Sequence, residues 1–415
     1  MDIAVIGGGA SGILSALSAA IIEPELKITI LERMDRIGKK ILATGNGRCN
    51  FSNTGVDISR YHGHNTLFAK DIFEKFTVDD TVSFFNSIGI FERQEAKGKL
   101  FPYSGQASSV LDCLRSALLS KKIDIITDFD VKKIKHVEGG FKIISKTDDY
   151  ILCKKVIMAG GGCASPTLGS NGSAFEILKE LGHKIYTPEA ALVQLKTQTE
   201  DVKGLNGIKI NAKAKLYVND DFLAEDEGEI LFTAYGLSGP PVFQLSALTP
   251  NKKNLYIFLD IMPLHNVKDI FEILRERKEN LISLRNDMTA EDFFTGFINK
   301  RIGNIILRKS GIEKLSFKIK DMDKKKLWNI AEKLKNLDFK IIGNNGLKNA
   351  QVTAGGASVE EFCQHTLESK TVKGLYACGE VLDIYGDCGG FNLQWAWSSG
   401  FVAGKSCAMS FGAKK

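Results

Sequence analysis

The chain of 415 residues predicts an α/β fold in which a Rossmann-like dinucleotide-binding domain is formed by both ends of the chain. A short apolar strand at residues 3–6 opens into a glycine-rich turn and a helix of small residues. A strand-and-turn pattern of the same kind resumes near residue 372, and the long region between lacks any βαβ alternation. The middle region is therefore predicted to be an insertion.

The first glycine-rich turn has the spacing of a dinucleotide-binding fingerprint. Gly7 allows the tight turn, Gly9 lets the backbone approach a pyrophosphate, and Gly12 permits close contact between helix and strand. The unpaired N–H groups of the helix that follows would then face the phosphates. Glu32 ends the next apolar run, about 20 residues further on, where an acid can bind the hydroxyls of an unphosphorylated ribose. Together these features predict a dinucleotide site, with a purely structural turn as the weaker alternative.

The segments after Glu32 continue the α/β pattern. Residues 36–53 are dense in glycine, cations and amides and too irregular for one element, which predicts a functional loop. Residues 155–162 repeat the pattern found at the start of the chain, an apolar strand followed by a turn of small residues. Helices are predicted at 66–90 and 106–120, strands at 123–127 and 130–134, and a hairpin-like region at 141–153.

The middle and the end of the chain complete the predicted organisation. Alternating stretches such as 212–218 and 255–259 predict an antiparallel β domain, and residues 266–337 read as helices. After the sheet pattern resumes, a helix starting near Phe391 follows two glycines, so its N-terminus suits a second negative or electron-rich part of a ligand. The alternative is an ordinary glycine-rich turn. The predicted domains are 1–186 with 346–415, 187–265 for the β domain, and 266–345 for a helical subdomain.

The net charge of +6 raises the question of a nucleic-acid partner. Residues 268–340 contain 18 Lys and Arg and 12 Asp and Glu, and 18 − 12 = 6 equals the excess of the whole chain. These charges alternate in sign or occupy the polar faces of predicted helices, as where Lys324, Lys325 and Lys326 precede an apolar face. We therefore interpret the segment as a solvated helical surface and disfavour a polyanion site.

Other features of the composition exclude several classes of protein. No apolar run reaches the roughly 18 residues that span a bilayer, and the first residues form a strand where a signal peptide would need an apolar h-region. We therefore expect no membrane partner and a cytoplasmic location. The eight cysteines form no C-x-x-C pair and no short metal-binding spacing, so reduced thiols and no metal site are expected.

In combination and order, the motifs resemble a known family over essentially the full length of the chain. They are GGGASG, GKKILATGNGRCNFSN, LFPYSGQASSV, VIMAGGG, LFTAYGLSGP, AQVTAGGA, TLESK and GLYACGEVLDIYGDCGGFNLQWAWSSG. The chain resembles the flavoproteins that include aminoacetone oxidase and the bile-acid-inducible reductase BaiN. The resemblance implies non-covalent FAD, a Rossmann-like domain made from both chain ends, and a central insertion with a β-barrel part and a helical part.

The resemblance also implies a set of cofactor contacts. The glycine turn would take the pyrophosphate and Glu32 the adenosine ribose, Val131 would hold the adenine through its backbone, and residues 379–383 would contact the pyrophosphate and ribityl chain. Arg48 and Asn50 are the candidate catalytic residues beside the flavin. The full set is Gly7, Gly9, Ala10, Ser11, Gly12, Glu32, Arg33, Lys40, Gly45, Arg48, Cys49, Asn50, Val131, Ala159, Gly160, Gly161, Gly379, Glu380, Asp383, Gly389, Gly390, Phe391 and Asn392.

The expected function is an FAD-dependent oxidoreductase that transfers hydride between the flavin and a small or medium-sized organic substrate. Reduction of a C=C bond is favoured by the bulky NLQWAW segment, with an oxygen-dependent amine oxidase and a non-catalytic redox-sensing module as alternatives. No second complete GxGxxG is present, so NAD(P)H is expected only as a transient donor. Ala234 stands where the family often carries a polar residue, so no proton-transfer role is assigned there.

Cys49 lies in the loop at 36–53 between Arg48 and Asn50. Positive neighbours lower the pKa of a thiol, which would suit a redox partner of the flavin. A disulfide-exchanging enzyme needs a second cysteine within reach, however, and no sequence neighbour supplies one. A small buried residue that packs a tight loop is the simpler hypothesis.

Overall fold

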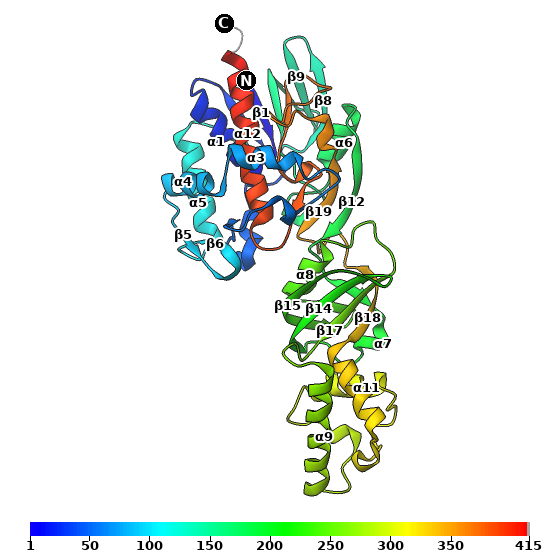
Figure 1. Ribbon diagram of the computed structural model, residues 1–415. Helices are drawn as coiled ribbons and strands as arrows, with labels where there is room; N and C mark the ends of the chain where they lie inside the picture. Colours follow the sequence, from blue (N-terminus) through cyan, green and yellow to red (C-terminus); the bar gives the residue numbers. More distant parts are fainter. Residues whose placement is uncertain (413–415) are drawn as a thin grey trace. The chain divides into compact units, whose positions relative to one another are not determined.

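A computed structural model describes residues 1–412 of the chain (Figure 1). Within them the chain forms two compact units. The terminal unit contains Met1–Ala191 and the segment from Gly346 onward, and the inserted unit is Leu192–Asn345. The terminal unit therefore combines both ends of the chain, as the resumed strand pattern predicted.

A five-stranded parallel sheet forms the centre of the terminal unit. Its order is β20 (Leu375–Ala377), β11 (Lys155–Met158), β1 (Ile3–Ile6), β2 (Ile28–Leu31) and β7 (Asp124–Ile126). All residues of β1 and β2 are buried, which explains why these strands read as continuous apolar runs. The Rossmann-type α/β fold is confirmed.

Two helices of small residues lie against each other beside this sheet (Figure 1). They are α1 (Ala10–Ile22) and α12 (Phe391–Gly412). A Cβ atom at Gly400 would press against the Ser11 backbone, and one at Gly404 would overlap the Ser15 carbonyl oxygen. Because only glycine leaves this space, the first and last helices approach to backbone contact.

The rest of the terminal unit surrounds the parallel sheet with shorter elements. The region predicted as one helix at 66–90 is two helices, because Thr77 and Asp80 form a capping box that starts α4. The hairpin-like region is confirmed as part of a three-stranded antiparallel sheet. The elements are α2 (Lys39–Ala43), α3 (Phe68–Lys75), α4 (Val78–Ser87), α5 (Ala107–Ser120), α6 (Ser173–Glu180), β3 (Ser52–Asn53), β4 (Tyr61–His62), β5 (Glu92–Gln94), β6 (Lys99–Pro102), β8 (Val131–Val137), β9 (Gly140–Ser145), β10 (Tyr150–Cys153), β12 (Ile185–Ala191), β19 (Val352–Ala357) and β21 (Tyr385–Gly386).

The inserted unit is a closed barrel continued by helices. One apolar core joins both parts, so the unit folds around a single interior. The barrel strands are, in spatial order, β13 (Leu195–Thr197), β16 (Gly236–Ser238), β15 (Asp221–Thr233), β14 (Lys209–Val218), β17 (Leu255–Asp260) and β18 (Leu337–Asn344). The helices are α7 (Thr199–Val202), α8 (Pro240–Ser246), α9 (Val267–Leu284), α10 (Lys300–Lys309) and α11 (Lys324–Lys335).

Two segments belong to other parts of the fold than the predicted domain boundaries implied. Leu337–Asn344, expected in the helical subdomain, is strand β18, which pairs with β17 and β13 in the barrel. Residues 187–191, expected in the β domain, belong to β12, which pairs with β19 in the terminal unit. Strand partners far apart in the chain decide both assignments, and a local residue pattern does not contain that information.

The contact between α1 and α12 makes a prediction about stability. Gly404→Ala places a Cβ against the Ser15 carbonyl, so it should lower the free energy of unfolding by about 2 kcal/mol despite the better helix propensity of alanine. Urea unfolding followed by tryptophan fluorescence measures this, since Trp395 and Trp397 lie on α12. Gly412→Ala is the control, because its Cβ would lie 3.9 Å from Glu23 Oε1, which is an ordinary van der Waals contact. Equal unfolding curves for both variants would contradict the close-packing account.

Candidate functional site

The residues expected to bind a nucleotide lie at one edge of the parallel sheet. Gly7 follows β1, Glu32 follows β2, Ala159 follows β11, and Gly379 lies two residues after β20. Strand β1 has β2 on one side and β11 on the other. The order in which strands are added across the parallel sheet therefore reverses at β1. Ligands of open parallel sheets bind outside the carboxyl ends of the strands at such a switch point.

The three fingerprint glycines have different structural roles. Gly7 has φ +103°, and a Cβ there would overlap the Ala159 carbonyl, while a Cβ at Gly12 would overlap the Gly7 carbonyl. These two glycines are required by the packing of the turn. Around Gly9, by contrast, a Cβ would meet no atom within 4 Å. Gly9 is also the N-cap of α1 and caps with no side chain, so the turn presents open space to the N–H groups of a helix.

Glu32 is buried and fixed beside this turn. Its Oε2 accepts a hydrogen bond of 2.8 Å from the Gly8 amide, and its Oε1 accepts one of 2.8 Å from the Met34 amide. Each carboxylate oxygen retains a lone pair that a ribose hydroxyl can use. The Glu32 carbonyl accepts from the Phe129 amide, which brings the segment that leads to Val131 next to the same acid. Val131 itself is buried at the start of β8.

Ala10, Ser11 and Arg33 are placed by contacts within the chain. Ala10 and Ser11 open α1, and a Cβ at Gly379 would press against the Ser11 side chain, so the first and last nucleotide segments meet here. The Arg33 guanidinium donates to the carbonyls of Pro166 and Gly169 at 3.0 and 2.7 Å. Arg33 therefore anchors the loop after the Gly160 and Gly161 turn.

The loop at 36–53 meets the C-terminal segment through several contacts. The Lys40 ammonium donates to Glu380 Oε2 at 2.6 Å, and Glu380 Oε1 accepts from the Thr353 amide. Asn53 Nδ2 donates to the Gly389 carbonyl at 2.8 Å. Gly390 has φ +103° and passes so close to Ser52 that a Cβ would overlap its carbonyl. The structure thus brings together two segments that lie more than 300 residues apart.

The surroundings of Arg48 and Cys49 do not fit a thiol that is activated by a neighbouring cation. The Arg48 guanidinium pairs with Glu95 at 3.0 Å and lies over the Phe101 ring at 4.2 Å, so its charge is already partnered. Cys49 is fully buried, and burial raises the pKa of its thiol to about 12. Gly45 packs against the Asn50 backbone in the same loop. Cys49 is placed as a packing residue.

Phe391 and Asn392 hold the start of α12 in place. The Phe391 carbonyl accepts a hydrogen bond of 3.0 Å from the Tyr61 hydroxyl. The Asn392 amide accepts from the Gly386 amide and donates to the Gly386 carbonyl, both at 2.8 Å, so this side chain closes the loop before the helix.

Four side chains among residues 1–412 have a buried oxygen without a hydrogen-bond partner, namely Asn50, Asp130, Gln194 and Asp383. Asn50 and Asp383 belong to the expected cofactor set, and Asp130 directly precedes Val131. Leaving a buried polar atom unpaired is unfavourable, so such atoms often mark the place of a missing ligand. Three of the four orphaned oxygens therefore fit a bound nucleotide that carries hydroxyl and N–H donors.

Sequence reasoning missed a group of side chains next to this site. His62 and His64 pair with Asp387 and Asp383, each at 2.7 Å, and Arg60 also contacts Asp387. The available signal was that two of the six histidines flank one glycine in the segment 62–64. Their aspartate partners lie about 320 residues away, so no local motif contains the pairs.

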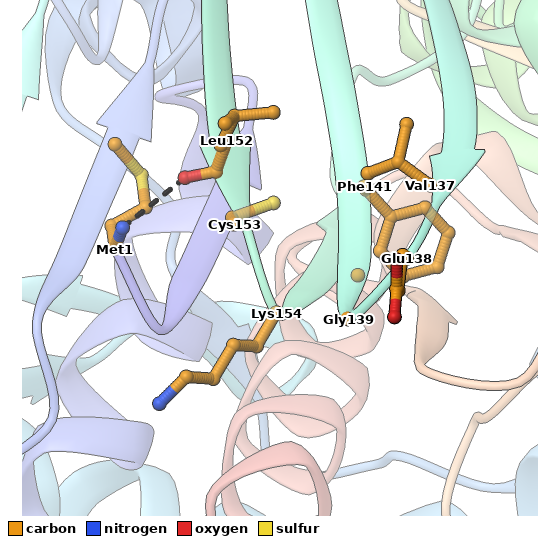
Figure 2. Close-up of a pocket in the computed structure, with 9 residues that line it drawn as sticks. Met1, Val137, Glu138, Gly139, Phe141, Leu152, Cys153 and Lys154 are labelled. Carbon is orange, nitrogen blue, oxygen red and sulfur yellow. Dashed lines mark hydrogen bonds between the residues drawn. The ribbon is translucent and has the colours of Figure 1, made fainter.

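A separate cavity of about 200 Å³ lies beside the start of strand β1, at the end of the strand away from Gly7 (Figure 2). It is lined by Met1, the turn between β8 and β9, and residues 152–154, and the Met1 ammonium donates to the Leu152 carbonyl. Strand β1 starts beside this cavity and runs away from it toward Gly7. The cavity is therefore not part of the nucleotide site. Within residues 1–412, no helix is long and apolar enough to cross a membrane, and no group of three metal-ligating side chains is present.

The sequence profile of the HI0933-like protein Rossmann domain matches residues 1–406. The chain belongs to the HI0933-like family. It is 37% identical to a 3-dehydro-bile acid delta(4,6)-reductase of Clostridium scindens, over 98% of each chain. It is 28% identical to a ribosomal RNA dihydrouridine synthase of Haemophilus influenzae, over 98% of this chain and 97% of the other. Both of these relatives match over nearly their full length and do not share only one domain with this chain.

Solved structures share the fold at low identity. A variant of the Escherichia coli quinol fumarate reductase FrdA matches with a TM-score of 0.51 and 15% identity, over all of this chain and 71% of the other. The 3-ketosteroid delta1-dehydrogenase of Sterolibacterium denitrificans matches with a TM-score of 0.50 and 11% identity, over 99% of each. These structures show the fold alone. The family and the 37% identical reductase identify the protein as an enzyme, a flavin-dependent oxidoreductase.

The open space at Gly9 allows a sharp test of the site. Gly9 has φ −82° and ψ −170°, which valine adopts readily, so Gly9→Val should fold but lose its bound flavin nucleotide. The ratio of flavin to protein absorbance and a thermal melt measure both outcomes. Gly12→Val is the comparison, since its side chain would clash inside the turn and should reduce stability as well. Stoichiometric flavin in folded Gly9→Val protein would show that the turn has another role.

The raised pKa of Cys49 predicts its reactivity. A thiol with a pKa of about 12 is almost entirely protonated at pH 8 and becomes thiolate only as the pH approaches 12, so iodoacetamide should label Cys49 slowly in the folded protein. Partial burial acts to raise the pKa of Cys363, yet hydrogen bonds from Thr366 and His365 lower it overall, so Cys363 should react faster. Peptide mass spectrometry compares the two sites, and Cys49→Ser should retain flavin. Rapid labelling of Cys49 with loss of activity would instead make the thiol part of the mechanism.

Proposed function

We propose that the protein is an FAD-dependent reductase of a C=C bond conjugated to a carbonyl group, with NAD(P)H as a transient hydride donor. The observation that carries this proposal is the chemistry shared by the two full-length relatives. A delta(4,6)-reductase of a 3-dehydro-bile acid acts on C=C bonds conjugated to a ketone. A dihydrouridine synthase saturates the ring C=C bond of uridine, which is also conjugated to a carbonyl. The two substrates differ, but in each of them the reacting C=C bond is electron-poor.

The residues present fit FAD as the cofactor. Gly9 and the start of α1 suit the pyrophosphate, and Glu32 suits the ribose of the adenosine half. The oxygens of Asn50 and Asp383 that have no hydrogen-bond partner suit donors on the flavin half of the cofactor. FMN lacks the adenosine ribose and would leave Glu32 without a ligand. When bound, FAD accepts a hydride from a nicotinamide and passes it to an electron-poor carbon.

The side chains around the start of α12 suit the flavin ring. Gly389 and Gly390 bring the backbone close, and the positive end of the 22-residue helix α12 favours negative charge on the ring. Phe391, Trp395 and Trp397 are buried behind this turn, and both indole N–H groups donate to backbone carbonyls. This wall is rigid and apolar, so it excludes water from one side of the ring. The Lys40 and Glu380 pair joins α2 to the turn that follows β20.

A second candidate substrate is a uracil ring within RNA. The two dihydrouridine synthases, of Haemophilus influenzae and Escherichia coli, act on ribosomal RNA by name. The specific observation is the basic segment 268–340. Within the described part of the chain, eight of its exposed cations form no ion pair, namely Lys268, Arg301, Arg308, Lys314, Lys320, Lys324, Lys325 and Lys340. Unpaired cations are available to neutralise phosphates, which supplies most of the affinity of non-specific RNA binding.

Anaerobic absorbance measurements test the proposed reaction. NADH or NADPH should bleach the flavin band of the purified protein, and an added conjugated enone, such as a 3-oxo-Δ4 steroid, should restore it with formation of the saturated product. Bleaching that only oxygen reverses, or bleaching by an amine, would favour the oxidase instead. Failure of every reductant would contradict enzymatic turnover and favour the redox-sensing module.

The same assay with a ribosomal RNA transcript separates the two substrate classes. If RNA is the substrate, dihydrouridine should form, and RNA affinity should fall steeply with salt. Lys324→Glu combined with Lys325→Glu should then weaken binding, whereas Lys252→Glu with Lys253→Glu, the same charge change outside segment 268–340, should have less effect. Enone turnover with no RNA binding would favour the small-molecule substrate.

A further inference from the structure

Two histidine–aspartate pairs flank the short strand β21 in the terminal unit. Strands β4 and β21 pair antiparallel, with His62 opposite Tyr385. His62 Nε2 contacts Asp387 Oδ1 at 2.7 Å, after the end of β21. His64 Nδ1 contacts Asp383 Oδ2 at 2.7 Å, before its start. The same pair of residue types therefore occurs twice within one small structural element.

The two aspartates differ in how their oxygens are used. Asp387 is occupied on both sides, by His62 at Oδ1 and by Arg60 at Oδ2, 3.3 Å away. Asp383 Oδ2 accepts from the His64 ring and from the His64 amide at 2.9 Å, but no donor bonds to Oδ1. Asp383 is 1% exposed, so this oxygen is shielded from bulk solvent. Of these two aspartates, only Asp383 thus has a carboxylate oxygen that accepts no hydrogen bond at all.

Several contacts fix the His64 side of this pair. Gly63 has φ +142° and passes close enough to the Asp383 carbonyl that a Cβ would overlap it. The His64 ring stacks on the Tyr186 ring with a centroid distance of 3.5 Å and an interplanar angle of 6°. Burial raises the pKa of Asp383, and the His64 donors and the nearby Gly355 amide offset this only in part. His64 is therefore held rigidly against a carboxylate that burial disfavours.

The family resemblance already implies that Asp383 contacts the ribityl chain, and we propose that His64 is the positioning residue that orients Asp383 so that its Oδ1 accepts a hydrogen bond from a ribityl hydroxyl of bound FAD. A carboxylate oxygen repels the pyrophosphate and needs a donor, and hydroxyls are the donors of the ribityl chain. Asp383 lies between Gly379 and Gly389 in the chain, the segments assigned to the pyrophosphate and the ring. This inference rests on the proposed FAD site and adds His64 to it.

Two conservative substitutions of His64 separate positioning from general packing. The amide nitrogen of asparagine can take the place of histidine Nδ1, whereas the amide of glutamine reaches the place of Nε2. His64→Asn should keep FAD affinity within about threefold, and His64→Gln should weaken it by about tenfold or more, as expected for one charge-assisted hydrogen bond. Equilibrium titration of apoprotein with FAD, followed by the quenching of flavin fluorescence, measures both.

His62 provides the matched control, because its bonding atom is Nε2 and its aspartate has no free oxygen. His62→Gln and His62→Asn should both leave FAD affinity within about twofold. A double-mutant cycle adds a second readout: in the Asp383→Asn background, His64→Gln should cause little further loss, because the two residues act through one bond. The cycle requires that all four proteins fold, which their melting temperatures check.

Two results would overturn the inference. One is equal FAD affinity of His64→Gln and His64→Asn in protein with an unchanged melting temperature. The other is an additive double-mutant cycle, which would make His64 and Asp383 independent. A wild-type protein that binds FAD tightly but reduces no C=C bond would falsify the proposed reaction and leave this flavin contact standing, so the two failures are distinguishable.

Discussion

The close approach of α1 and α12 is the constraint on which the terminal unit depends. Gly400 and Gly404 leave no side chain between the helices, so α12 reaches the backbone of Ser11 and Ser15. This contact joins the first and last helices of the chain. It also brings Gly379 against Ser11, so that the N-terminal glycine turn and the C-terminal segment share one sheet edge. Larger residues at these positions would separate the two halves of the nucleotide site.

The buried polar atoms at this edge follow a consistent pattern. Most are satisfied within the chain, as Glu32 is by two amides and Glu380 by Lys40 and Thr353. These bonds hold the acids in fixed positions before any ligand arrives, which reduces the ordering that binding requires. The oxygens of Asn50 and Asp383 are left without donors. A site that is rigid except for a few unpaired acceptors is suited to a ligand with matching donors.

The inserted unit has its own apolar core, and none of the nucleotide residues comes from it. Its charged side chains form many local ion pairs, as Lys309 does with Asp201 and Asp338. Relatives that match over the full length nevertheless act on substrates as different as a bile acid and ribosomal RNA. A constant cofactor unit combined with an independently folded insertion offers a physical route to such different substrates, because surface changes in one unit need not disturb the other.

The sequence alone determined the strand, turn and helix around Gly7, Gly9 and Gly12, and the return of the sheet pattern near residue 372. These features depend on local periodicity and on glycine geometry, which neighbouring residues encode. Only the tertiary structure decided that Cys49 is buried, that Arg48 pairs with Glu95, and that β18 closes the barrel. It alone joined His64 to Asp383. Burial and pairing with residues distant in the chain both depend on the tertiary structure, and a local sequence pattern contains information on neither.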